Sequence, residues 1–110
     1  MSERKKLVRK QFRDAVFRRD AFACVVCGLS STPERAEHEL DAHHITDRNE
    51  MPNGGYVAEN GISLCETCHL KAEAFHRGEP VPPGFWPAEL YALIGSDEGS
   101  ARTASERLGE

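Results

Sequence analysis

One small α+β domain is the fold class that the sequence predicts, and three observations lead to it. Apolar residues recur at helical spacing near the N-terminus, two short segments further on have the composition of strands, and two pairs of cysteines lie far apart in the chain. With 110 residues the chain has room for only a modest core. A covalent or metal cross-link between distant segments would therefore add much to its stability.

The first predicted element is an amphipathic helix between Lys6 and Asp20, in which four apolar residues fall at helical spacing. Residues 1–20 carry eight Lys or Arg and three acidic residues, a net charge of +5, whereas residues 21–110 carry −9. Such a run of charge is ordinarily a solvated helix face, and contact with phosphates is the alternative. The apolar residues are Val8, Phe12, Ala15 and Val16.

The central part of the chain predicts a short strand with a tight turn, and then two strands joined by a loop and followed by a helix. Residues 21–31 predict a short strand and a tight turn, and residues 38–45 (HELDAHHI) predict a strand. The loop 46–60 contains the turn signal Asn-Gly-Gly. Residues 61–76 (GISLCETCHLKAEAFH) then predict a short strand, a turn and a helix that begins near Cys68.

The C-terminal third changes in composition. Four prolines between residues 80 and 87 hold the backbone extended until about Ala88, where a short helix is predicted. The last stretch, SDEGSARTASERLGE, is compatible either with disorder or with a final helix. We therefore divide the single domain into an N-terminal helical arm (1–20), a core (21–78) and a Pro-rich segment with a short helix (79–110).

The four cysteines form two C-x2-C pairs, Cys24 with Cys27 and Cys65 with Cys68, separated by 37 residues. Four thiolates make up the complete tetrahedral shell of a structural zinc ion. Two disulfides or a redox C-x-x-C are the alternatives. No apolar segment follows the charged N-terminus as a secretory signal would require, and no run approaches the roughly 20 apolar residues of a membrane span. We expect a cytoplasmic protein, in which zinc is favoured over disulfides.

Three polar features lie between and beside these cysteines. His43 and His44 are adjacent, Asn60 follows, and His69 comes directly after Cys68. The run RDAVFRRDAFACVVCG, followed by AHHI, GGYVAENGISLC and CETCH, resembles the zinc-stapled branch of the HNH endonucleases, members of the ββα-metal nuclease superfamily. The resemblance covers about residues 8 to 76. It implies a ββα-metal core with a structural zinc ion held by the four cysteines, and a cytoplasmic protein of bacterial, archaeal or phage type.

The resemblance also implies roles for individual residues. His44 would be the general base, because a neutral imidazole accepts a proton near pH 7. His43 and His69 would hold a catalytic divalent ion, and Asn60 would brace the loop and orient the base. Mg²⁺ or Mn²⁺ is the expected ion, and paired imidazoles also suit Ni²⁺, Co²⁺ or Zn²⁺.

Glu73 is a candidate third ligand for that ion on helical geometry. It lies one turn after His69, about 40° around the axis and about 6 Å along it. His76 shares the face but lies about 10 Å along the axis, where it would contact phosphate, bind Glu73 or remain on the surface. Asp41 could orient a histidine or be a solvated strand residue, and His38 is given no role.

The adjacent histidines raise a geometric question, since neighbouring side chains of a strand point to opposite faces. Both rings would reach one cleft if the strand ended or bent at His43 and His44. We expect such an ending, because a regular strand through the pair would forbid the arrangement.

The function expected from these residues is that of a metal-dependent HNH endonuclease, which nicks or cleaves DNA and leaves a 3′-hydroxyl and a 5′-phosphate. The phosphate contacts expected from the N-terminal helix imply weak sequence preference. A non-catalytic zinc module that binds nucleic acid and a nuclease subunit that depends on a partner remain alternatives, and a homodimer or larger assembly is open. The candidate phosphate-binding residues are Arg9, Lys10, Arg13, Arg18 and Arg19.

Overall fold

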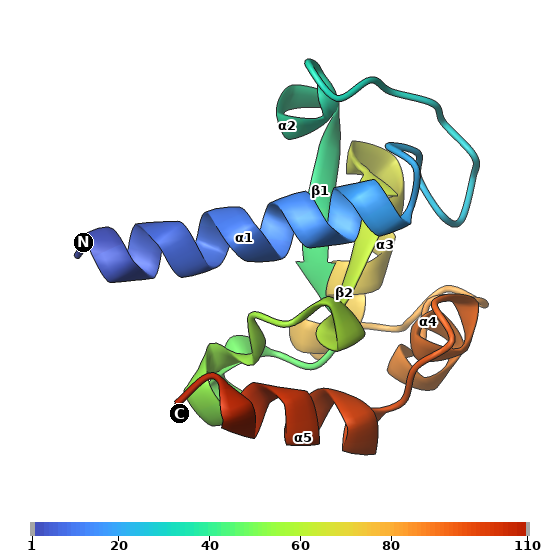
Figure 1. Ribbon diagram of the computed structural model, residues 1–110. Coiled ribbons are helices and arrows are strands. Elements are labelled where there is room, and N and C mark those ends of the chain that lie inside the picture. The colour runs from blue at the N-terminus through green and yellow to red at the C-terminus, as the bar shows by residue number, and fades with distance from the viewer. Residues whose placement is uncertain (1, 110) are drawn as a thin grey trace.

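The structure is a computed structural model that describes residues 2–109, and its architecture confirms the α+β prediction (Figure 1). Strands β1 (Leu40–His44) and β2 (Gly61–Cys65) form a two-stranded antiparallel sheet. The long helix α1 (Glu3–Arg19) crosses one face of the sheet, and helix α3 (Glu66–His76) packs on the other. Two strands followed by a helix that begins directly after β2 make up a ββα core.

The remaining helices extend this core. Sequence inspection overlooked α2 (Ala36–Glu39), a single turn that leads into β1. Helix α4 (Pro87–Leu93) follows the Pro-rich segment, as expected. The final stretch, left open between disorder and helix, forms α5 (Glu98–Arg107), which packs against the loop that joins the two strands. Three short 3₁₀ turns occupy that loop at Arg48–Glu50, Pro52–Gly55 and Ala58–Asn60.

Apolar side chains from the sheet and from helices α1 to α5 meet in one core. The largest fully buried apolar side chains are Ile45, Ile62, Leu64, Leu90 and Val16. Leu90 comes from α4, so the C-terminal third is part of the same core. Among the described residues, no helix combines the length and the apolar character that crossing a membrane requires.

Helix α1 begins earlier than its apolar spacing indicated, because Ser2 caps it: the Ser2 Oγ accepts a hydrogen bond from the Lys5 N–H at 3.2 Å. Its other end is fixed to the sheet by Arg19. The Arg19 guanidinium donates to the carbonyls of Ala58 and Gly61, both at 2.7 Å, and pairs with Asp20. This clamp sets the position of the basic helix relative to the strands.

Gly61, at the start of β2, lies directly against α1. A Cβ at this position would fall 2.5 Å from the Val16 Cγ2 atom and 2.7 Å from the Phe12 Cε1 atom. We expect Gly61→Ala to lower the free energy of unfolding by about 1–3 kcal/mol, because the helix would have to move off the sheet. Urea denaturation checks this. The control variant Gly99→Ala adds a methyl group at an exposed position of α5, and its stability should be unchanged or higher. Equal losses of stability in the two variants would contradict the prediction.

Candidate active site

The four cysteines, distant in sequence, form one cluster in space. Their sulfur atoms all lie within 4.8 Å of one another, and the Sγ atoms of Cys27 and Cys65 are 3.6 Å apart. Four thiolates around zinc, each about 2.3 Å from the ion, have sulfur atoms about 3.8 Å apart. The cluster is therefore tetrahedral and consistent with a zinc staple.

Local structure explains how the cysteines converge. Cys24 and Cys27 lie in the tight turn closed by the bridge between Ala23 and Ser30. Helix α3 begins at Glu66, earlier than expected, so that Cys65 is its N-cap residue and Cys68 lies in its first turn. The carbonyl of Ser63 on β2 accepts a hydrogen bond from the Val25 N–H at 3.0 Å, which joins the two turns.

The chemistry of the cluster also favours a metal. Burial opposes ionisation of Cys24, but hydrogen bonds from backbone N–H groups outweigh it and lower the pKa of this thiol to about 7. All four cysteines are free thiols in the structure. Burial and the neighbouring sulfurs raise the pKa of Cys68, so a cation shared by the four sulfurs would be needed to hold all of them as the thiolates that bind a metal.

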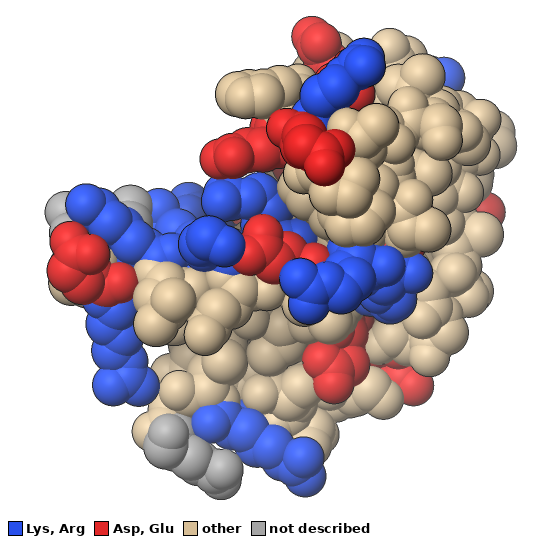
Figure 2. Space-filling model, turned by 45° about the horizontal axis from the view of Figure 1, so that its top comes forward, with Lys and Arg blue, Asp and Glu red and all other residues tan. Residues whose placement is uncertain are grey.

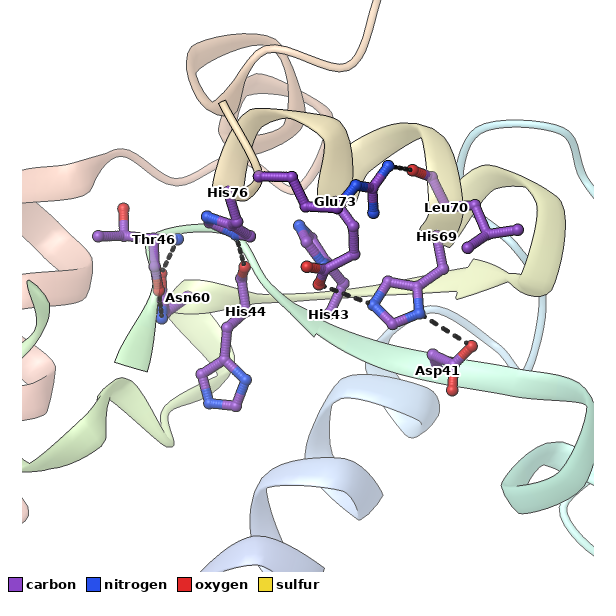
Figure 3. Close-up of polar contacts among 10 residues, drawn as sticks. Asp41, His43, His44, Thr46, Asn60, His69, Leu70, Glu73 and His76 are labelled. Carbon is purple, nitrogen blue, oxygen red and sulfur yellow. Dashed lines mark hydrogen bonds and ion pairs between the residues drawn. The ribbon is translucent and has the colours of Figure 1, made fainter. Parts of the chain in front are cut away.

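A second cluster joins β1 to α3 and contains His43, His69 and Glu73, whose ligand atoms lie within 4.8 Å of one another. The Glu73 Oε1 atom is 3.2 Å from the His43 Nδ1 atom and 3.1 Å from the His69 Nε2 atom (Figure 3). The other ring nitrogen of His69 lies 3.1 Å from the Asp41 carboxylate. With a cation in the cluster, the Asp41 carboxylate would accept a proton held on Nδ1, and the lone pair of Nε2 would be directed at the cation.

Burial and charge prepare these three groups for a cation. His43 is 2% exposed, and this burial lowers the pKa of its imidazole. The neighbouring imidazole of His43 lowers the pKa of Glu73 to about 2, so the carboxylate is ionised near neutral pH. The His43 Nδ1 atom, although close to Glu73, has no aligned hydrogen-bond partner. Two imidazoles, one of them with an unsatisfied buried nitrogen, and a carboxylate make a donor set that fits a divalent ion.

Strand β1 ends at His44, as expected, although it is regular up to that residue. His43 pairs with Ile62 and His44 with Gly61, and the two rings lie on opposite faces of the sheet. Nevertheless His44 lines the same cleft as His69 and Glu73, a hollow of about 450 Å³. The ring of His43 does not line this hollow, and it is connected to the cleft only through its contacts with His69 and Glu73. In a sheet of only two strands the outer edge of β1 is open, and the cleft extends around that edge.

Aromatic rings hold the imidazole of His44 on the face toward α1. Its ring centroid is 4.6 Å from that of Phe12, in a stacked arrangement, and 4.8 Å from that of Tyr56, edge to face. Burial, together with the neighbouring His43, lowers the pKa of His44 to about 4, and its Nε2 atom is buried without a hydrogen-bond partner. The ring is therefore neutral near pH 7. Its backbone carbonyl is held by the His76 Nε2 atom at 3.1 Å (Figure 3).

Asn60 fixes the chain directly after His44. It is fully buried, and its side-chain amide donates to the carbonyls of Thr46 at 3.0 Å and Gly55 at 3.2 Å. Its side-chain oxygen accepts from the Thr46 N–H at 3.0 Å and the Tyr91 hydroxyl at 2.7 Å. The Asn60 backbone carbonyl accepts from the Ile45 N–H at 2.9 Å. Every hydrogen-bonding group of this side chain is satisfied, which holds the loop rigidly.

Three residues around the site were not identified from the sequence. The sequence placed Phe12 only among the apolar residues of the N-terminal helix and indicated no role at the site for Tyr56 or Tyr91, yet all three contact His44 or Asn60. Helical spacing placed Phe12 on the buried face of α1 but gave no sign of its partner. Tyr91 is 31 residues away from Asn60 in sequence, so only the fold brings its hydroxyl to that side chain.

The hydroxyl of Tyr91 supports the loop after the histidine pair, and we expect its loss to weaken the whole domain. In Tyr91→Phe the free energy of unfolding should fall by about 1–3 kcal/mol, because Asn60 would keep a buried oxygen with one partner fewer. Chemical denaturation measures the change. The matched variant Tyr56→Phe removes a hydroxyl that contacts the exposed Arg48, and it should cost less than about 0.5 kcal/mol. Similar losses in both variants would contradict this account.

Lys and Arg side chains follow the length of α1 (Figure 2), but they differ in what they contact. Arg9 and Arg13 line the cleft that contains His44, His69 and Glu73. Arg13 also lies 3.5 Å from Glu37, an ion pair at an exposed position. These two arginines are therefore the candidate phosphate contacts that the fold places beside the site.

The other three predicted cations lie away from the cleft. Lys10 pairs with Asp14 on the surface of α1. Arg18 is exposed and lines a separate hollow that also contains Asp14. Arg19 uses its guanidinium to clamp α1 to the loop before β2. For Arg19 this geometry favours a structural role over a phosphate contact.

Comparison with known proteins was made at three levels. Residues 24–75 match the family model of the HNH endonucleases, a span that begins at the first cysteine and reaches almost to the end of α3. Neither the curated proteins nor the solved structures gave a match. The matched span contains both clusters and Asn60, and the family implies a nucleic-acid substrate. Residues 24–75 of this chain thus match the HNH endonuclease domain and contain a tetrahedral cysteine cluster, and the match supports a nuclease-type function in general.

Proposed function

We propose that this domain is a metal-dependent endonuclease that hydrolyses phosphodiester bonds of DNA by nicking or by double-strand cleavage. The observation that carries the proposal is the cleft around the edge of β1. It brings a neutral histidine, His44, to the same hollow as His69 and Glu73, which form a cation-binding donor set with His43. Hydrolysis of a phosphodiester needs such a base and such a cation close together.

In this proposal His43, His69 and Glu73 hold the catalytic ion. When bound, a divalent ion neutralises charge on the phosphate and on the departing oxygen. The donor set combines imidazole with carboxylate, so Mg²⁺ or Mn²⁺ is the proposed ion, and Ni²⁺, Co²⁺ or Zn²⁺ also suits the two imidazoles. Asp41, 3.1 Å from the Nδ1 atom of His69, would favour the tautomer that presents Nε2 to the ion.

His44 is the proposed general base. Its imidazole nitrogen in the cleft takes a proton from water as the water oxygen forms a bond to phosphorus, and the bond from phosphorus to the 3′ oxygen breaks. The departing oxygen takes a proton from solvent, so the products are a 3′-hydroxyl and a 5′-phosphate. Phe12 and Tyr56 fix the plane of the ring, and Asn60 fixes the backbone that follows it.

In this proposal a zinc ion held by the four-cysteine cluster has a structural role. Arg9 and Arg13 make the first contacts with phosphates of the substrate. Phosphate contacts position the substrate and read no bases, so we propose weak sequence preference. Lys10, Arg18 and Arg19 are not included, since their contacts or positions direct them away from the cleft.

Conversion of supercoiled plasmid to nicked and linear forms tests the proposal. The zinc-loaded protein would be assayed with Mg²⁺, Mn²⁺ or Ni²⁺ and with EDTA, beside His69→Ala at matched zinc content and His38→Ala as a control on an exposed histidine. We expect cleavage with added ion only, retained in His38→Ala and lost in His69→Ala. An intact plasmid under every ion would reject the enzyme, and equal cutting by wild type and His69→Ala would point to a contaminant.

A further inference from the structure

The cleft beside the histidines continues into a second hollow. This hollow, of about 590 Å³, lies between the N-terminal half of α1 and the loop 48–56, and its far end reaches Leu108 and Gly109. Three residues, Arg9, Arg48 and Tyr56, line both hollows, so the two form one continuous groove.

Charge distinguishes the second hollow from the rest of the molecule. Although the chain has a net charge of −4, Arg4, Lys5, Arg9 and Arg48 line this hollow, and no carboxylate does so among the residues that the structure describes. The first hollow, by contrast, includes Asp47 and Glu73. A cationic groove that begins at a cation-binding cluster fits a polyanion that continues past the reacting phosphate.

The spacing of the cations along α1 fits the phosphate backbone of a nucleic acid as the ligand. Lys5, Arg9 and Arg13 are four residues apart, which places successive side chains about 6 Å along the axis with a drift of about 40°. The three cations therefore form a row of about 12 Å that ends in the candidate active site. Arg48 stands on the opposite wall, where its guanidinium donates to the Tyr56 hydroxyl at 3.1 Å.

The groove offers little to the bases themselves. The guanidinium of Arg9 lies over the Tyr56 ring, 5.7 Å from its centroid, and Phe12 and His44 meet the same ring at right angles. Because its neighbours surround that ring, Tyr56 is not a free platform on which a base could stack. Asn53 donates to the Ser105 carbonyl at 3.0 Å, so α5 holds the loop wall of the groove in place.

We propose that this cationic groove, lined by Arg4, Lys5, Arg9 and Arg48, binds the DNA backbone on one side only of the bond that is cut. The inference rests on the proposed function for the position of the cut. The row extends about 12 Å from Arg13 in the candidate active site to Lys5 in the groove, so at about 3.4 Å per nucleotide along a duplex strand it would engage about three phosphates beyond the cut. The enzyme should then need DNA on one side of its cut and little on the other.

Mapping of cuts near DNA ends tests this asymmetry. A duplex of about 30 base pairs and mixed sequence, labelled at either end, would be cleaved by wild type, by Arg4→Ala/Lys5→Ala and by the control Lys6→Ala/Arg102→Ala. The control removes two charges at exposed helix positions outside both hollows. For wild type and control, cuts should stop about three nucleotides further from one end than from the other. The groove variant should lose this difference. Symmetric cutting by wild type would overturn the proposal, and so would loss of the asymmetry in the control variant.

Binding measured without cleavage separates this inference from the proposed function. Fluorescence anisotropy of the same labelled duplex in EDTA gives the slope of log affinity against log salt concentration. In Arg4→Ala/Lys5→Ala the slope should fall by about one for each phosphate that is no longer neutralised, and it should stay unchanged in the control. Equal slopes in wild type and groove variant would reject the groove even if plasmid cleavage succeeds. If the protein does not cut but the slope falls, the endonuclease proposal fails while the DNA-binding groove stands.

Discussion

Cys68→Ala is expected to abolish cooperative unfolding of the domain. The cysteine cluster joins a turn near residue 27 to the start of α3 and so closes the long segment that contains both candidate histidines and Asn60. Structural zinc sites contribute about 10–16 kcal/mol, whereas a small domain has a net stability of about 5–15 kcal/mol. Because Cys68→Ala leaves only three sulfurs at the site, it should remove most of the free energy that stabilises this fold. Near-UV circular dichroism and thermal denaturation would show the loss.

Two comparisons make this measurement specific to the metal. Val26→Ala changes a partly exposed residue within the same turn, between two of the cysteines, and should retain a normal transition. Treatment of wild type with a strong zinc chelator should reproduce the behaviour of Cys68→Ala, and readdition of zinc should reverse it. A folded, zinc-free protein with an unchanged melting temperature would show that the core is sufficient without a staple.

His44→Ala is expected to lower the rate of DNA cleavage by about 10²–10⁴-fold, the usual contribution of a general base. The binding of Mn²⁺ at the second cluster should be unaffected, because His44 lies on the opposite face of β1 from His43. His43→Ala, in contrast, should lose both metal binding and cleavage. Isothermal titration with Mn²⁺ and single-turnover cleavage, each at matched zinc content, would separate the two roles.

His44→Gln provides the second test of the base, since it keeps more of the volume packed against Phe12 while it lacks a group that accepts a proton near pH 7. It should be as inactive as His44→Ala, with a melting temperature closer to wild type. Recovery of activity in His44→Gln would assign this position to packing, and loss of Mn²⁺ binding in both variants would assign it to the metal site.

Local signals in the sequence were sufficient for much of the fold. The C-x2-C pairs identified the cysteine cluster because a tetrahedral site needs four sulfurs and little else. The two strands and α1 followed from short apolar runs and helical spacing. The three residues of the second cluster were predicted by combining the family resemblance with helical geometry, since His69 and Glu73 are one turn apart.

Other features depended on contacts between distant segments. The strand ends at His44, as expected, but the sequence did not reveal that the two rings would face opposite sides of a sheet with an open edge. The hydrogen bond of Tyr91 to Asn60 needed the docking of α4. Arg19 clamps its own chain because α1 crosses the sheet in a direction that brings its guanidinium to the loop before β2. The positive charge of the residue could not indicate that direction from the sequence.

Helix α3 places two centres of different chemical softness one peptide bond apart, since Cys68 belongs to one cluster and His69 to the other. Sulfur donors select zinc strongly, whereas nitrogen and oxygen donors accept harder and more exchangeable ions. The type of donor atom alone would then direct two different ions to neighbouring sites on one short helix. A rigid thiolate site at the first turn would also fix the angle from which His69 meets its ligand, so the slow-exchanging ion would set the geometry of the fast-exchanging one.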